Sequence, residues 1–227
     1  MSLSACRADV RVQVALTPTG SGTVSARVVL DRQAAAVVGA GIDLGDLRRD
    51  GWQVTGPTPA GDGSQTISVS HPFADAGQAT TLLGRLGGPV HLTVLHHGGT
   101  VSSSVGVRGT IDLRGGLDAL AGATPTLPGG LGPALATVAK AGGTVPTVTV
   151  AFAAALPGPP GGVHGGATVA GDVVTWTAPL GAVTTVAVAA SRTDTTAERW
   201  LAAAAALLVV LVALGVVEVV RARRAPA

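Results

Sequence analysis

The chain of 227 residues contains no tyrosine, two phenylalanines, three tryptophans, one methionine and one cysteine. Aromatic residues make up 2% of the sequence and charged residues 12%. Proteins that bind RNA or DNA need a basic face and aromatic rings on which bases can stack. With so few rings and charges, the composition argues against nucleic-acid binding. The single cysteine, Cys6, also excludes an internal disulfide bond.

Glutamate is missing from most of the chain, and the formal net charge of +2 is unevenly placed. Between Arg7 and Asp194, ten arginines and one lysine balance eleven aspartates. The excess comes from four arginines near the C-terminus, against two glutamates. Intrinsic disorder is excluded because 47% of the residues are hydrophobic. We therefore expect a neutral folded domain followed by a basic tail.

One long hydrophobic run, Trp200–Val220, is present and contains a single ionisable residue, Glu218. At about 1.5 Å per residue, a helix of this length spans about 30 Å, the thickness of one hydrocarbon core. Arg221 and two further arginines follow it, whereas the preceding flank is nearly balanced in charge. The positive-inside rule predicts a single-pass plasma-membrane protein with a cytoplasmic C-terminus and an extracytoplasmic N-terminal domain.

The N-terminal sequence Leu3–Cys6, LSAC, fits a bacterial lipobox, in which a cysteine after small residues becomes lipidated. The five residues before Cys6 cannot supply the basic and apolar regions of a signal peptide. Either the natural chain begins further upstream and Cys6 is lipidated, or Cys6 is an ordinary free thiol. Lipidation would account for an unpaired cysteine in an exported protein.

The sequence thus predicts five segments. These are residues 1–6, a remnant of a signal peptide with lipobox; 7–193, an exported domain; 194–199, a stalk; 200–220, a transmembrane helix; and 221–227, a cytoplasmic basic tail.

Within the exported domain, apolar and polar residues alternate along several segments, a pattern typical of half-buried strands. The first two such segments, around Val10–Leu16 and Gly22–Leu30, flank the turn TPTGSG and predict a hairpin. Asp31 and Asp75 are expected to cap short helices. Eight of the ten residues from Pro157 to Gly166 are glycine or proline. The predicted class is α+β, with an antiparallel-rich curved sheet packed by a few short helices.

The order of these segments resembles the LppM family of actinobacterial cell-envelope lipoproteins. The resemblance rests on the following motifs: LSAC, the hairpin with GSGTV and VVLD, DGW, SHPF, IDLRGGL, ALPG, GDVVTW and the terminal hydrophobic helix. Heavy use of alanine, glycine and arginine suits a GC-rich genome. The resemblance implies a membrane-anchored lipoprotein with an α+β domain and a role in lipid or glycolipid recognition. It implies no enzymatic activity, and nothing in the sequence indicates a cofactor.

The candidate ligand-binding residues are Trp52, Phe73, Asp112, Arg114 and Trp176. The aromatic residues, with Phe152, are the only ones outside the anchor, and they either fill the core or line an apolar cleft between sheet and helices. Asp112 and Arg114 project to the same side of a strand, so they form a structural ion pair or contact a polar ligand.

Catalytic and metal sites find little support in the sequence. Adjacent His96 and His97 would point to opposite faces of a strand, so they cannot bind one metal ion together. There is no G-x-S-x-G motif, no Walker lysine and no pair of glutamates in the domain. We therefore expect a non-enzymatic protein without a metal.

The sequence leaves three functions open. The first is non-covalent binding of a membrane lipid or glycolipid. The second is a scaffold that docks another envelope protein through its sheet edges. The third, an exported hydrolase, would need a reactive serine.

Overall fold

The structure, a computed structural model, describes residues 7–38, 44–85, 89–99, 102–116, 147–193 and 200. Cys6, the stalk 194–199 and the predicted anchor beyond Trp200 lie outside these residues. Within the described ranges, no helix is both long enough and apolar enough to cross a membrane.

The described elements are eleven strands and three short helices. In chain order they are β1 (Arg7–Leu16), β2 (Gly22–Leu30), α1 (Arg32–Val38), α2 (Gly45–Arg49), β3 (Gln53–Pro59), β4 (Gln65–Phe73), α3 (Ala76–Gly84), β5 (Val90–Gly98), β6 (Ser102–Asp112), β7 (Thr147–Ala155), β8 (Pro160–His164), β9 (Thr168–Ala170), β10 (Val173–Ala178) and β11 (Val183–Thr193).

Seven strands form sheet A, in the order β3-β4-β2-β1-β7-β10-β9. The predicted hairpin is confirmed: β1 and β2 pair antiparallel from Ala8↔Leu30 to Leu16↔Gly22. β7 then returns beside β1 and is the one parallel partner among the described pairs.

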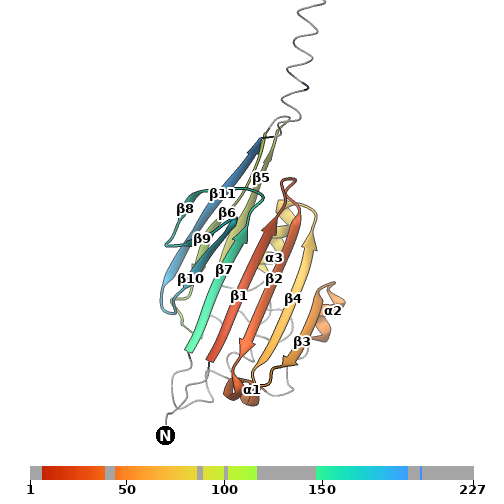
Figure 1. Cartoon of the computed structure of the whole chain (residues 1–227), viewed down its shortest axis with the longest axis vertical. Helices are drawn as coiled ribbons and strands as arrows, with labels where there is room; N and C mark the ends of the chain where they lie inside the picture. The colour runs from red at the N-terminus through yellow and green to blue at the C-terminus, as the bar shows by residue number, and fades with distance from the viewer. Residues whose placement is uncertain are drawn as a thin grey trace, which may run out of the picture.

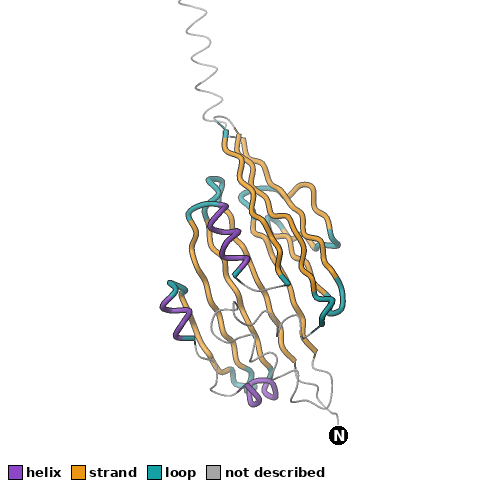
Figure 2. The backbone as a smooth tube through the Cα atoms, turned by 180° about the vertical axis from the view of Figure 1, so that it is seen from behind, coloured by secondary structure: helices purple, strands orange, loops and turns teal. Residues whose placement is uncertain are grey.

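Sheet B has four strands in the order β5-β6-β11-β8. It lies with α3 over one face of sheet A, which leaves the other face of each sheet outward (Figures 1 and 2). The α+β class is confirmed, but the strands form two sheets rather than one curved sheet. The chain passes between the two sheets at several connections, and the last of these is the short turn at residues 179–182 between β10 and β11.

The core between the two layers consists mainly of valine, leucine and alanine. The alternation read from the sequence sets it up, because Val14, Val24 and Ala26 point inward and their chain neighbours point outward. The largest fully buried side chain is Trp176, whose ring centroid lies 5.9 Å from that of Phe152. These rings occupy volume that the small side chains around them leave free.

Helix α3 begins where the sequence predicts it. The Asp75 side chain accepts a hydrogen bond from the backbone N–H of Gln78 at 2.8 Å and thereby caps the helix. On its buried side, Thr80 Oγ1 accepts a hydrogen bond from the backbone N–H of Val94 at 2.9 Å. Since Val94 belongs to β5, an edge strand of sheet B, α3 also covers that edge.

The Gly- and Pro-rich run 157–166 contains the strand β8. It pairs with β11 at Ala187↔His164 and Ala189↔Gly161, with a register shift between these positions. The run lacks the apolar alternation that is typical of a strand. Pairing with β11 makes this segment a strand, which its own residues, low in strand propensity, do not predict.

Candidate functional site

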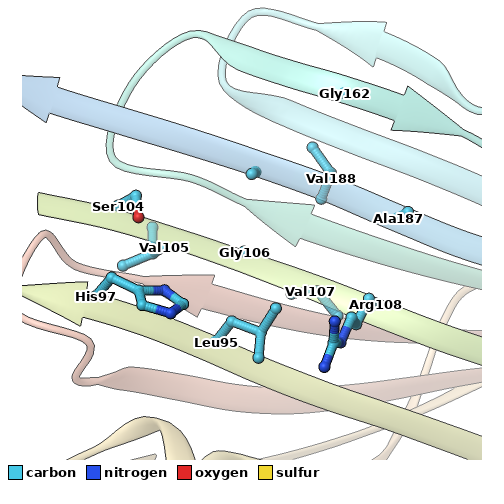
Figure 3. Close-up of a pocket in the computed structure, with 11 residues that line it drawn as sticks. Leu95, His97, Ser104, Val105, Gly106, Val107, Arg108, Gly162, Ala187 and Val188 are labelled. Carbon is cyan, nitrogen blue, oxygen red and sulfur yellow. The ribbon is translucent and has the colours of Figure 1, made fainter.

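A hollow lies on the outward face of sheet B, opposite the core (Figure 3). It results from one cross-strand row in which Leu95 pairs with Gly106, Gly106 with Ala189, and Ala189 with Gly161. Three of the four positions in this row carry either no side chain or a methyl group. The row is therefore lower than its neighbours, and Leu95 forms its wall.

We call this hollow, of about 270 Å³, the outer hollow; its lining residues are Leu95, His97, Ser104, Val105, Gly106, Val107, Arg108, Gly162, Ala187, Val188 and Ala189. Ligand sites commonly measure about 300–1,000 Å³, so this volume fits one part of a larger molecule.

Polar groups lie at both ends of this apolar floor. His97 pairs with Ser104 on one side of the central row, and Arg108 pairs with Ala187 on the other. Each is two residues along its strand from the central row, about 7 Å. Figure 3 shows Leu95, His97 and Arg108 rising from neighbouring strands around the floor. An apolar trough with a hydroxyl and a cation at opposite ends can hold a chain that carries polar groups.

Gly106 is required by the close approach of β11. A Cβ atom at this position would come within 2.7 Å of the Val188 carbonyl oxygen and 3.3 Å of Ala189 Cβ. A larger residue would therefore both fill the floor and push against the neighbouring backbone. The floor is thus built by the packing of β6 on β11.

The aromatic residues proposed as ligand contacts lie in the core. Trp52 and Phe73 are each 4% exposed, and Trp176 is fully buried. The Trp52 ring meets His71 edge-on with centroids 5.3 Å apart. All three side chains belong to the buried core, and none of them lines the outer hollow.

Asp112 and Arg114 form the ion pair that the sequence suggested. Arg114 Nη2 lies 2.6 Å from Asp112 Oδ2, and Asp112 Oδ1 accepts from the Arg114 backbone N–H at 3.0 Å. These bonds, led by the guanidinium, lower the pKa of Asp112 to about 2, and the carboxylate raises the pKa of Arg114. Asp112 lies four residues from Arg108 along β6, about 13 Å, so the pair is separate from the outer hollow.

The two adjacent histidines separate as the strand geometry requires. His97 lines the outer hollow, whereas the His96 ring packs against Gly20 in the β1–β2 turn, within 2.7 Å of the position of a Cβ there. They do not converge on one point. Among the described residues, no group of three potential metal ligands comes together.

The outer hollow was not predicted from the sequence. The signal that points to it is the run of small residues at outward positions of two strands, Gly106 in β6 with Ala187 and Ala189 in β11. In each strand taken alone, these residues are compatible with an ordinary sheet. Only the register that aligns them makes a trough.

The sequence matches no protein-family model and no curated protein. Among solved structures, a similar arrangement occurs in the folded domain of LppM from Mycobacterium tuberculosis, determined by NMR. The TM-score is 0.47 and the sequence identity 14%, over 87% of this chain and 96% of that chain. A likeness of this degree leaves the family resemblance of the sequence motifs as a prediction.

Proposed function

We propose that this chain is a membrane-anchored cell-envelope protein whose exported domain binds a lipid or glycolipid non-covalently in the outer hollow. The observation that carries the proposal is the apolar floor at Gly106 and Ala189, with Leu95 as its wall, on the outward face of sheet B. Outward faces of sheets are usually polar, and an apolar trough there gains free energy when an alkyl chain covers it. The binding needs no covalent step and no cofactor.

The position of the outer hollow along the chain supports a ligand that comes from the membrane. Ser191 pairs with Ser104 at one end of the hollow, and β11 ends two residues later at Thr193. The predicted anchor starts at Trp200, seven residues beyond Thr193. Seven residues of fully extended chain reach at most about 25 Å. The anchor would hold this end of sheet B close to the bilayer surface.

The polar groups around the floor indicate how a ligand would be oriented. Arg108 offers a cation that pairs with a phosphate or with sugar hydroxyls, and His97 and Ser104 offer further hydrogen bonds. A ligand with an acyl segment along the floor and a polar head at one end would contact both the apolar floor and the polar groups beside it. We therefore expect amphiphiles to bind better than free sugars or free hydrocarbons.

Docking of another protein through the sheet edges, the second function considered, finds less support in the edges themselves. β9 has three residues, β8 begins with Pro160, and β3 contains Pro57 and Pro59. The edge strands β3 and β8 also show register shifts, and Thr80 occupies a backbone donor of β5. Short strands, prolines and irregular register are features that hinder strand addition.

The proposal is tested by titrating a fluorescent phospholipid with one short acyl chain into the full chain held in phosphatidylcholine nanodiscs. Leu95→Asp places a charge on the apolar wall of the outer hollow, and we expect it to weaken binding by about tenfold or more. The matched control is Val169→Asp, which adds the same charge at a 49% exposed valine on β9. Equal affinity for all three proteins would contradict the proposal.

A hydrolase remains the more distant alternative. A fluorophosphonate probe that labels a serine of the intact chain would favour it over simple binding.

A further inference from the structure

The outward face of sheet A places two arginines directly opposite each other. Arg11 in β1 pairs with Arg27 in β2, and both side chains are exposed. Cross-strand neighbours of this kind have Cβ atoms about 4.5–5.5 Å apart, and like charges in such positions destabilise a sheet. The pairing therefore needs a compensating partner or serves another purpose.

The described part of the chain offers no such partner. Asp9 is the nearest acid on β1, and its Oδ2 lies 3.2 Å from Arg7 Nε in an ion pair. Neither Arg11 nor Arg27 forms a hydrogen bond or an ion pair with any described residue. Three arginines and one aspartate thus surround this position, whereas the formal charges of the whole domain balance.

These side chains surround a second hollow, of about 410 Å³, which we call the arginine hollow; its lining residues are Arg7, Asp9, Val10, Arg11, Arg27, Val29, Thr149 and Ala151. Its floor is low because Ala151 stands beside Arg11, and Thr149 beside Asp9, in the parallel pairing of β1 with β7. Two guanidinium groups at the rim of a hollow, neither of them paired with a described residue, can close on one ligand from two sides. The threonine adds a hydroxyl that can donate a hydrogen bond to the same ligand.

We propose that the arginine hollow binds a phosphate-type oxyanion, through Arg11 and Arg27 together. The planar guanidinium matches phosphate oxygens with two parallel hydrogen bonds, and a dianionic group offsets the repulsion between the two arginines. The site lies on the opposite side of the molecule from the outer hollow. It is therefore independent of the proposed function.

The place of the site in the fold also bears on where the phosphate comes from. Arg7 and Asp9 stand at the start of β1, at the end of sheet A away from the point where β11 ends (Figure 1). A membrane anchor after β11 would hold the arginine hollow away from the bilayer, whereas a lipid on Cys6, the residue before Arg7, would bring it to the bilayer surface. The phosphate-type group belongs either to a soluble ester or to a lipid head group, and the two arms of the test distinguish these sources.

The test uses the full chain in phosphatidylcholine nanodiscs, with the side-chain Nε–Hε signals of the arginines followed by NMR. Inorganic phosphate and glycerol phosphate are added at constant ionic strength against chloride. We expect saturable shifts at Arg11 and Arg27, and a loss of phosphate affinity of about tenfold in Arg11→Gln and in Arg27→Gln. Arg48→Gln is the matched control, since Arg48 is exposed on α2 and no described residue pairs with it.

A second arm replaces part of the phosphatidylcholine with phosphatidylglycerol and omits the soluble phosphates. Arginine shifts in this arm alone would support the oxyanion site and assign it to a lipid head group. Absence of saturable shifts in both arms would overturn the proposal. So would shifts of the same size with chloride, or an equal loss of affinity in Arg48→Gln, because both indicate general charge attraction.

Discussion

The indole Nε1–H of Trp176 donates a hydrogen bond to the backbone carbonyl of His164 at 2.6 Å. Trp176 belongs to β10 in sheet A and His164 to β8 in sheet B, so this bond joins the two sheets. It also holds β8, whose Gly- and Pro-rich sequence gives it little strand propensity. A fully buried side chain is thus used for both packing and connection.

Removing this bond should destabilise the fold beyond the loss of ring volume. Trp176→Phe keeps an aromatic ring and deletes the donor, whereas Trp52→Phe makes the same change where the indole N–H has no partner among the described residues. We expect Trp176→Phe to lower the free energy of unfolding by about 1 kcal/mol more than Trp52→Phe. Urea unfolding of the two variants measures the difference. Equal losses would show that the bond adds nothing to stability.

Two neighbouring glycines separate the effect of backbone conformation from that of close packing. Gly165 and Gly166 both have positive φ, 86° and 68°. A Cβ atom at Gly165 would lie 1.7 Å from the Thr185 carbonyl oxygen, whereas at Gly166 it would meet open space. Gly166→Ala should therefore cost about 1–2 kcal/mol for the left-handed conformation. Gly165→Ala should cost about 1–3 kcal/mol more, and thermal unfolding that ranks them in reverse would contradict the packing of β8 on β11.

The pKa of Asp112, about 2, predicts how the ion pair responds to acid. Because the folded pKa is below the ordinary pKa of an aspartate, 3.8, the stability that this carboxylate contributes is present above pH 3.8. It is lost as the pH falls towards 2. NMR titration of the Asp112 carboxyl carbon should show this midpoint. Arg114→Gln should raise it only part of the way to 3.8, since the Arg114 backbone N–H still donates to Oδ1.

Arg85→Gln provides the control for this titration, because Arg85 ends α3 and makes no contact with Asp112. An Asp112 midpoint that does not move in Arg114→Gln would show that the guanidinium is not the cause of the shift.

Patterns in neighbouring residues predicted the elements that form between neighbouring residues, the first hairpin and the start of α3. Alternation along Val10–Leu16 and its partner strand indicated the hairpin, and Asp75 marked the start of α3, because a period and a cap are written in neighbouring residues. The parallel pairing of β1 with β7 has no such signal, since its partners lie well over one hundred residues apart. For the same reason one sheet was expected where the structure has two.

The outer hollow and the arginine hollow could not be predicted from the sequence for a related reason. The floor at Gly106 exists only because the register sets it between Leu95 and Ala189. Arg11 and Arg27 likewise become opposed only when the hairpin register is known. Residue types could indicate which side chains are apolar or charged. They could not indicate which side chains become cross-strand neighbours, because the paired strands are far apart in the sequence or their register is unknown.

Photo-crosslinking tests lipid binding in the outer hollow most directly. A phospholipid with a diazirine on its acyl chain would be activated with the full chain in nanodiscs, and the labelled residues identified by mass spectrometry. We expect labels outside the predicted anchor to concentrate around Leu95, Gly106 and Ala189, and to decrease strongly in Ala189→Leu, which fills the floor. Labels confined to the anchor, or unchanged in Ala189→Leu, would contradict the proposed function.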